Sequence, residues 1–258
     1  MQHFELLQGD AQSPRRGRWH TARGTVQTPA FMPVATRALM RGPWHHQLRP
    51  MGTEMLLTNA FHLYTRPGLE TVQKLGGVHG MTGWDGPILT DSGGFQAFSL
   101  SKMTRPTKNG FEIDHPVHGG KISWTPRLAF EVQAAFQPDV AMLLDVCPAE
   151  PLVERTCADA VQTTLRWAKE QREFHEARGG LQSGQAQFGI VQGGVFPALR
   201  EECAEGLVHL DFDGYAVGGV SVGEGFEAMM AGVENSTGHL PTQKIRYLMG
   251  VGTPRDLV

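Results

Sequence analysis

The sequence predicts an α/β protein folded as an irregular (β/α)8 TIM barrel. Three observations carry this prediction. Seven short apolar runs recur along the 258 residues, amphipathic helical patterns lie between them, and acidic, amide or glycine residues follow five of the runs where strands would end. Functional groups at the carboxyl ends of many strands are typical of a TIM barrel. An open sheet usually carries a glycine-rich phosphate turn after its first strand, and this chain has none there.

The predicted strands are near-continuous apolar runs, as expected for strands covered on both faces. They occupy residues 31–34, 55–58, 87–90, 140–144, 188–191, 215–217 and 245–249. Thr125 predicts a helix cap, and the proline after it opens a helix over residues 127–136. Apolar residues recur every fourth position from Val153 to Leu165, which predicts a longer helix that ends before Gly179.

The strand count is one short of the eight that a barrel needs. The chain stops at Val258, where the helix after the seventh strand should begin. We therefore expect one domain over residues 1–258, a barrel without its last βα unit. Because an open barrel exposes two strand edges, the polypeptide by itself is expected to be poorly stable.

Composition is that of a soluble globular protein, with 40% hydrophobic and 19% charged residues. No apolar run could span a bilayer and no secretory signal opens the chain, so a cytoplasmic protein without membrane contact is expected. Cys157 and Cys203 fall in helical stretches as core residues, and three separated cysteines fit a reducing compartment. The histidines show no metal signature, so no metal site is predicted within the chain. An arginine cluster over residues 15–23 predicts a solvated loop, with a basic patch as the alternative.

The segment over residues 90–96 carries the strongest functional signal. An acid, a hydroxyl, two glycines, an aromatic ring and an amide crowd into one turn after a buried strand. Asp91 and Gln96 can bond the edge of a flat heterocycle, Phe95 can stack on its face, and glycines let the backbone come close. Helix N-capping is the structural alternative for Asp91. The candidate residues of this turn are Asp91, Ser92, Gly93, Gly94, Phe95 and Gln96.

Four further strand ends carry polar or glycine residues. Asp145 supplies a second carboxylate, and Gln192 offers both a donor and an acceptor. Gly218 and Gly219 expose backbone N–H groups beside Glu224, and a loop from Gly250 could face phosphate. Capping or ordinary close packing is the alternative in each case. Together these residues predict a barrel enzyme whose pocket holds a purine-like ring, and none of them names the reaction.

With these segments in hand, the chain closely resembles the tRNA-guanine transglycosylases, also called queuine tRNA-ribosyltransferases. The segments that carry the resemblance follow one another in order at residues 28–34, 59–63, 66–68, 89–96, 189–194 and 247–252. The resemblance implies an irregular TIM barrel with a zinc subdomain. It also implies an exchange of the wobble guanine of certain tRNAs for a 7-deazaguanine base, as in queuosine biosynthesis. A non-catalytic accessory subunit of the same family, which binds tRNA or base, is the alternative.

The resemblance assigns roles residue by residue. It implies that Asp91 is the acid–base group that also binds the base, and that Gly219 is the backbone donor to the base carbonyl. The substrate-binding residues that it implies, together with their neighbours, are Asp91, Ser92, Gly93, Gly94, Phe95, Gln96, Asp145, Cys147, Gln192, Gly218, Gly219, Val220 and Met249. The tRNA-contacting residues that it implies are Gly250, Val251, Gly252, Thr253, Pro254, Arg255 and Asp256.

The resemblance also implies parts that lie beyond Val258. These are a nucleophilic aspartate and the three cysteines and one histidine that hold one structural zinc. We therefore expect no cofactor within this chain, an inactive polypeptide when it is taken alone, and a homodimer when it is complete. Val146 departs from the usual bacterial glutamate. Residues 113–120, a loop that the resemblance implies as a tRNA contact, also depart from the usual family sequence.

The size of the residue at position 222 predicts which base the protein accepts. Cys147 and Val222 resemble the bacterial pattern, whereas members that accept bulky queuine tend to have glycine at the second position. A valine there would crowd a cyclopentenediol substituent, so 7-aminomethyl-7-deazaguanine is the expected incoming base. Glu224 is expected to help bind its ammonium group, directly or through the surrounding backbone.

Overall fold

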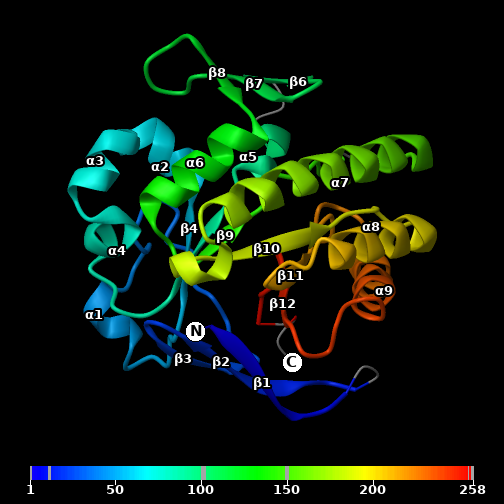
Figure 1. Ribbon diagram of the computed structural model, residues 1–258, viewed down its shortest axis with the longest axis horizontal. Helices are drawn as coiled ribbons and strands as arrows, with labels where there is room; N and C mark the ends of the chain where they lie inside the picture. The colour runs from blue at the N-terminus through cyan, green and yellow to red at the C-terminus, as the bar shows by residue number, and fades with distance from the viewer. Residues whose placement is uncertain (1, 11–12, 100–102, 149–150, 255, 257–258) are drawn as a thin grey trace.

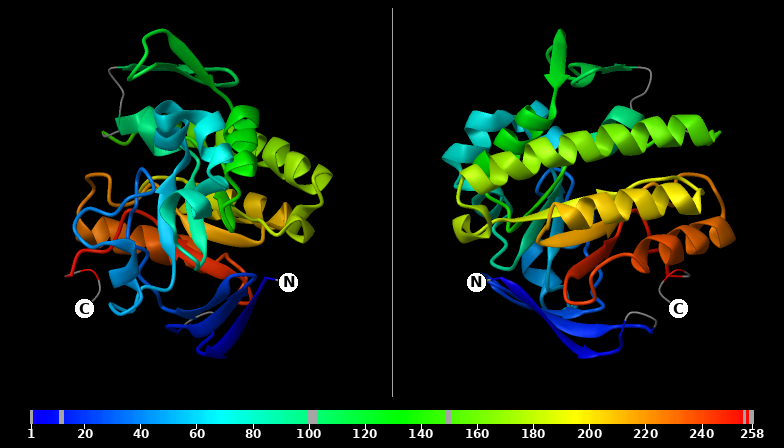
Figure 2. Two further views of the ribbon diagram at one scale, coloured as in Figure 1. Left: turned by 90° about the vertical axis from the view of Figure 1, so that its left-hand side faces the viewer. Right: turned by 45° about the vertical axis from the view of Figure 1, so that its right-hand side comes forward.

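A curled parallel sheet forms the centre of the computed structural model, which describes residues 2–10, 13–99, 103–148, 151–254 and 256 (Figures 1 and 2). Its six strands are β4 (Leu56–Asn59), β5 (Ile88–Asp91), β9 (Val140–Met142), β10 (Ala186–Val191), β11 (Gly214–Val217) and β12 (Ile245–Leu248). They lie in the order β12-β11-β10-β9-β5-β4, and every pair is parallel. Because all six strands run in the same direction, their carboxyl ends meet at one edge of the sheet.

The first predicted strand is only partly right. Residues 31–34 form no regular strand, and a single parallel bridge joins Val34 to Leu57. The Leu57 N–H donates to the Pro33 carbonyl over 3.1 Å, and the Ala35 N–H donates to the Leu57 carbonyl over 2.7 Å. Proline has no N–H to donate, so Pro33 interrupts the ladder that a full strand would need.

Helices cover the outer face of the sheet (Figure 1). The long ones are α6 (Pro126–Phe136), α7 (Glu154–Ala177), α8 (Pro197–His209) and α9 (Phe226–Thr237). The shorter ones are α1 (His45–Leu48), α2 (Ala60–Leu63), α3 (Leu69–Lys74), α4 (Gly77–Thr82) and α5 (Gly94–Ser99), with a π-helical turn at Tyr64–Gly68 and a 3-10 turn at Gly180–Ser183. The cap prediction is confirmed, because the Thr125 hydroxyl accepts the Leu128 N–H over 3.1 Å and α6 begins at the proline.

Two antiparallel sheets flank this body at opposite ends, and neither was predicted (Figure 1). The N-terminal sheet comprises β1 (His3–Gln8), β2 (Arg16–Thr21) and β3 (Gly24–Thr28). The other comprises β6 (Thr104–Thr107), β7 (Gly110–Asp114) and β8 (Lys121–Trp124). The prediction of a solvated loop at the arginine cluster is therefore wrong. Gly17 and Trp19 alternate with the arginines and are buried, so this stretch is a half-buried strand.

The hydrophobic core lies between the sheet and its helices. All six positions of β10 are buried, as expected for a strand covered on both faces. Cys157 on α7 and Cys203 on α8 are fully buried, which confirms that both belong to the core. Among the described helices, none combines the length and the apolar character that crossing a membrane requires.

Candidate active site

A cavity of about 340 Å³ opens at the carboxyl ends of the parallel strands. Every predicted substrate-binding residue except Gln96 lines it, although these residues come from five separate segments of the chain. Its lining consists of Asp91, Ser92, Gly93, Gly94, Phe95, Asp145, Cys147, Ile190, Gln192, Gly218, Gly219, Val220, Ser221, Val222, Tyr247, Met249 and Gly250. Small-molecule sites typically measure about 300–1,000 Å³, so this volume suits a single heterocycle.

Two carboxyl groups share the cavity. Burial, and then the charge of the nearby Asp145, raise the pKa of Asp91 to about 7, although a hydrogen bond from the Asn59 side chain acts in the opposite direction. Burial also raises the pKa of Asp145 to about 6, against a Gln192 amide that donates to its Oδ2 over 2.6 Å. Asp91 Oδ1 is buried and has no hydrogen-bond partner among the described residues. A carboxyl that has one partner-free oxygen and titrates near neutrality can take up and release a proton during a reaction.

The other side chains that line the cavity carry no charge. Phe95 is 51% exposed, so its ring offers an apolar face to a flat ligand. Burial, and then the Asp91 charge, raise the pKa of the Tyr247 hydroxyl. Burial, and then the Asp145 charge, raise the pKa of the Cys147 thiol to about 12. Cys147 therefore stays protonated near neutral pH and is no nucleophile.

Gln192 and Gly219 form a polar part of the cavity wall. Gln192 Nε2 is occupied by Asp145, while its Oε1 is buried and has no partner among the described residues. Gly219 has a φ of +60°, and a Cβ there would collide with that Oε1. Only glycine allows the backbone to approach the amide so closely. The Gly219 N–H donates to no protein acceptor among the described residues, so it is available to a ligand.

Gln96 lies outside this cavity. It follows Phe95 by one residue on α5, and a helix turns by about 100° per residue, so the two side chains point in different directions. The Gln96 Oε1 instead accepts from Asn59 Nδ2 over 2.9 Å in the protein interior. Asn59 is paired with Asp91 in the sheet register, so Gln96 supports the strand end from behind.

The segment predicted to contact tRNA begins at the cavity, since Gly250 lines it. Asp256 Oδ2 accepts the Thr253 N–H over 2.8 Å and the Thr253 hydroxyl over 2.7 Å. This carboxylate therefore closes a turn around Pro254. Arg255 lies outside the described residues.

Sequence reasoning missed Arg200, which lies behind the glycine loops. It shares the buried side of α8 with Cys203 and Leu207, at positions i, i+3 and i+7. A charged residue at an apolar-stripe position is unusual unless it is paired, and this signal could have singled it out.

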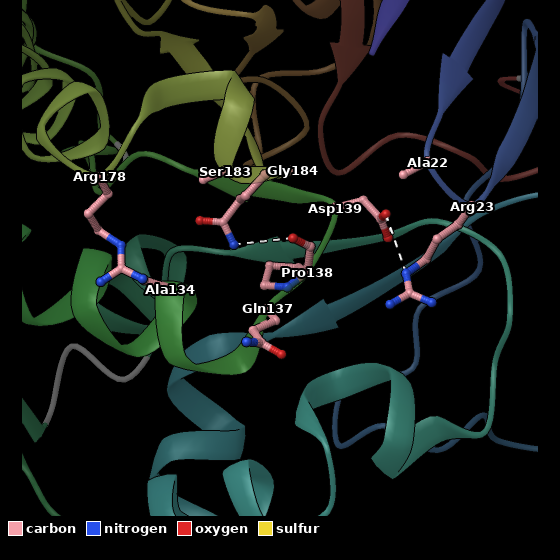
Figure 3. Close-up of a pocket in the computed structure, with 10 residues that line it drawn as sticks. Ala22, Arg23, Ala134, Gln137, Pro138, Asp139, Arg178, Ser183 and Gly184 are labelled. Carbon is pink, nitrogen blue, oxygen red and sulfur yellow. Dashed lines mark hydrogen bonds and ion pairs between the residues drawn. The ribbon is translucent and has the colours of Figure 1, made fainter. Parts of the chain in front are cut away.

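A second cavity, of about 420 Å³, lies at the opposite end of the strands around Asp139 (Figure 3). Asp139 Oδ1 lies 3.6 Å from Arg23 Nε, and its Oδ2 lies 2.9 Å from His79 Nε2 and accepts the Ile88 N–H. The acid thus joins β5 to the segment before β9. These contacts give Asp139 a structural role.

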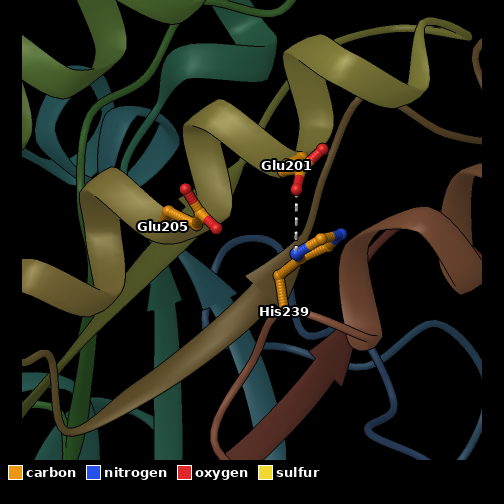
Figure 4. Close-up of side chains that lie close together, drawn as sticks. All are labelled: Glu201, Glu205 and His239. Atoms are coloured by element: carbon orange, nitrogen blue, oxygen red, sulfur yellow. Dashed lines mark ion pairs between the residues drawn. The ribbon is translucent and has the colours of Figure 1, made fainter.

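Metal-ligand types converge at one place in the described part of the chain. Glu201 and Glu205 of α8 lie within 4.8 Å of His239, and Glu201 Oε1 is 3.9 Å from His239 Nδ1 (Figure 4). Both glutamates are exposed, and such carboxylates commonly pair with histidine without an ion. This group contains no cysteine, so it does not fit the cysteine-rich zinc site that the resemblance implies.

Comparison with known proteins gives one consistent result. The sequence profile described as queuine tRNA-ribosyltransferase matches residues 10–258. The queuine tRNA-ribosyltransferase of Thiobacillus denitrificans is 46% identical over 255 residues, which cover 99% of this chain and 68% of the relative. Those of Francisella tularensis subsp. novicida and Xanthomonas euvesicatoria pv. vesicatoria are 42% and 45% identical over 99% of this chain and over 68% and 66% of their own lengths. The chain thus spans about two thirds of these relatives, and it belongs to the queuine tRNA-ribosyltransferase family.

Proposed function

We propose that the protein is a tRNA-guanine transglycosylase, which replaces the wobble guanine of tRNA with a 7-deazaguanine base. One observation carries the proposal: a single cavity holds two raised-pKa carboxyls, an amide, a bare backbone N–H and an exposed aromatic ring. The family membership gives this cavity its substrate class. The partners proposed with it are tRNA, the free base and, in the complete assembly, a second copy of the chain.

The cavity suits the edge of guanine group by group. The Asp145 carboxylate accepts from N–H donors of the base, and Gln192 Oε1 offers a further buried acceptor. The Gly219 N–H donates to the base carbonyl, while Phe95 stacks on the ring. This arrangement distinguishes guanine from adenine, because the amino group of adenine would face the Gly219 donor.

Asp91 handles the proton in this proposal. When guanine leaves the ribose, its ring nitrogen needs a proton, and when the new base is attached, that base must lose one. One group can serve both steps if its pKa lies near the working pH. Asp91, with a pKa of about 7 and a partner-free Oδ1, meets this requirement.

We place this chemistry on a TIM-barrel-like domain. The curled parallel sheet agrees with it. The nucleophilic aspartate and the zinc subdomain remain expectations from the family resemblance. No step proposed for the described residues depends on a metal ion.

A binding measurement tests the proposal. Guanine titrated into the protein by calorimetry is expected to bind with one-to-one stoichiometry. Adenine is expected to bind at least about 100-fold more weakly, because it leaves buried donors and acceptors unpaired. Equal affinity for the two purines would contradict the proposed base-reading geometry.

Val222 is proposed to set the size limit on the incoming base. It lines the cavity, and Glu224 Oε2 holds its N–H over 2.8 Å and the Gly223 N–H over 3.0 Å. Because this carboxylate also accepts the Ser221 N–H, we favour backbone groups over Glu224 itself as the contact for the ammonium group of 7-aminomethyl-7-deazaguanine.

Replacing Val222 with glycine is expected to admit queuine, since the deletion removes the side chain that would crowd the cyclopentenediol. The measurement is queuine incorporation into tRNA by the protein encoded by the complete gene. Guanine exchange by the same variant serves as the control and should stay within about threefold of wild type, because no base-binding group is removed. No gain in queuine incorporation would count against the size argument.

A further inference from the structure

Arg200 is a fully buried cation without a carboxylate in contact. Arg200 lies in the first turn of α8, and its side chain is 0% exposed. No described acid lies within ion-pair distance of it. Burial lowers the pKa of the guanidinium, although arginine stays charged near neutral pH. Burying a charge among neutral groups is costly unless every donor is satisfied. The hydrogen-bond partners of Arg200 therefore indicate what it is kept for.

All but one of those partners are carbonyl groups of the two glycine loops that border the base cavity. Arg200 Nε donates to the Gly194 carbonyl over 2.6 Å. Its Nη1 and Nη2 both donate to the Gly218 carbonyl over 3.2 Å, and Nη2 also donates to the Gly219 carbonyl over 3.1 Å. One rigid guanidinium thus ties the loop after β10 to the loop after β11.

These hydrogen bonds also fix the direction of the N–H groups that belong to the same peptide units. In a trans peptide the C=O and the N–H point in opposite directions. Holding the Gly218 carbonyl toward the core therefore turns the Gly219 N–H away from it, and holding the Gly219 carbonyl does the same for the Val220 N–H. Both residues line the cavity. Among the described residues, neither N–H donates to a protein acceptor.

Helix α9 is shaped to admit the guanidinium. Ser236 accepts from Arg200 Nη1 over 3.0 Å and donates to the Gly232 carbonyl over 2.7 Å. A Cβ on Gly232 would lie 3.0 Å from Val220 Cγ1, 3.2 Å from Arg200 Nε and 3.3 Å from Arg200 Cζ, all closer than ordinary contact. The position of the guanidinium is thus fixed from the helix side as well as from the loops.

We propose that Arg200 is a positioning residue that aims the Gly219 and Val220 N–H groups at the carbonyl oxygen of the bound base. The inference rests on the proposed function, because it assigns a ligand atom to these two donors. It predicts that Arg200 influences how strongly the protein recognises that one oxygen, in addition to how well the protein folds.

Binding of guanine and of 6-thioguanine tests this. The thio base keeps the N–H donors of guanine but replaces its carbonyl oxygen with sulfur, a weaker acceptor. Lysine at position 200 keeps the charge but cannot span three carbonyls. In Arg200→Lys the ratio of guanine to 6-thioguanine affinity is expected to fall at least about tenfold from its wild-type value, a coupling of about 1.4 kcal/mol.

Arg172→Lys is the matched control. Arg172 is 14% exposed and bonds the Asp211 carbonyl and Asp213, at the other end of β11. Its replacement is expected to leave the ratio unchanged. If Arg200→Lys weakens both bases equally, its role is merely structural and the proposal is overturned.

A second pair of variants covers the case in which Arg200→Lys does not fold. Gly232→Ala keeps Arg200 but presses on both its guanidinium and the Val220 side chain. It is expected to lower the ratio of guanine to 6-thioguanine affinity about threefold or more, since positional shifts weaken hydrogen bonds steeply. Gly238→Ala is its control, because a Cβ there meets only the Glu234 carbonyl at 3.6 Å. An unchanged ratio in Gly232→Ala would overturn the inference. If wild-type protein prefers guanine to 6-thioguanine and the variants keep that preference, this inference alone is refuted. If wild-type protein binds no guanine, the proposed function is refuted as well.

Discussion

Replacing Asp91 with asparagine is expected to lower base exchange by at least about 100-fold and up to about 10,000-fold, the usual contribution of a general acid–base group. Asparagine keeps the size of the side chain but cannot accept or release the proton. The measurement is the guanine exchange rate of the protein encoded by the complete gene. Asp85→Asn is the control, because Asp85 is 82% exposed and is paired with Arg49. Exchange above about one tenth of wild type would contradict the role of Asp91.

The same substitution is expected to stabilise the fold. The folded-state pKa of Asp91 is raised from 3.8 to about 7, so folding favours the protonated form. Its stabilising contribution is therefore complete below pH 3.8 and is lost as the pH rises to about 7. Asparagine avoids this loss, so the variant should melt higher than wild type, by a margin that widens from pH 4 to pH 7 and then levels off. A variant that melts lower at pH 8 would contradict the burial of this charge.

Replacing Asp145 with asparagine is expected to weaken guanine binding at least about 100-fold, or about 2.7 kcal/mol, since hydrogen bonds to a charged acceptor are each worth about 1.5–3 kcal/mol. The pKa of Asp145 is raised to about 6. Guanine affinity should therefore fall as the pH drops below 6, because the protonated carboxyl accepts fewer N–H groups. Calorimetry between pH 5 and pH 8 measures both effects. Wild-type affinity in the variant would contradict the assignment.

Gln192→Leu provides the companion to this measurement. Its amide holds Asp145 Oδ2 over 2.6 Å, so the two residues act as one unit. The sum of the losses in guanine-binding free energy in the two single variants is expected to exceed the loss in the double variant, as happens for residues in direct contact. Strict additivity would show that Gln192 does not position this carboxylate.

The site could be predicted from sequence wherever its residues follow a strand directly. Asp91 and Gln192 each stand at the end of a buried apolar run, and parallel strands bring such ends to one edge. The Thr125 cap and the four-residue repeat on α7 likewise depend only on local spacing. These features are local rules of chain geometry, so one sequence contains them.

The features that sequence reasoning missed depend on tertiary contacts. Gln96 turns toward Asn59 because of where α5 begins, which no local pattern fixes. Arg200 bonds carbonyls from two distant loops, and carbonyl groups leave no trace in a sequence. The β2 strand contains two arginines, Arg16 and Arg18, and the burial of its Trp19 depends on the sheet that the strand joins.

Incorporation of radiolabelled guanine into tRNA tests the central claim most directly. The protein encoded by the complete gene is expected to transfer label to tRNA that has guanine at the wobble position, and the Asp91→Asn variant, folded and able to bind tRNA, is expected to transfer little or none. Absence of labelled tRNA with folded wild-type protein, or undiminished labelling with Asp91→Asn, would contradict the account.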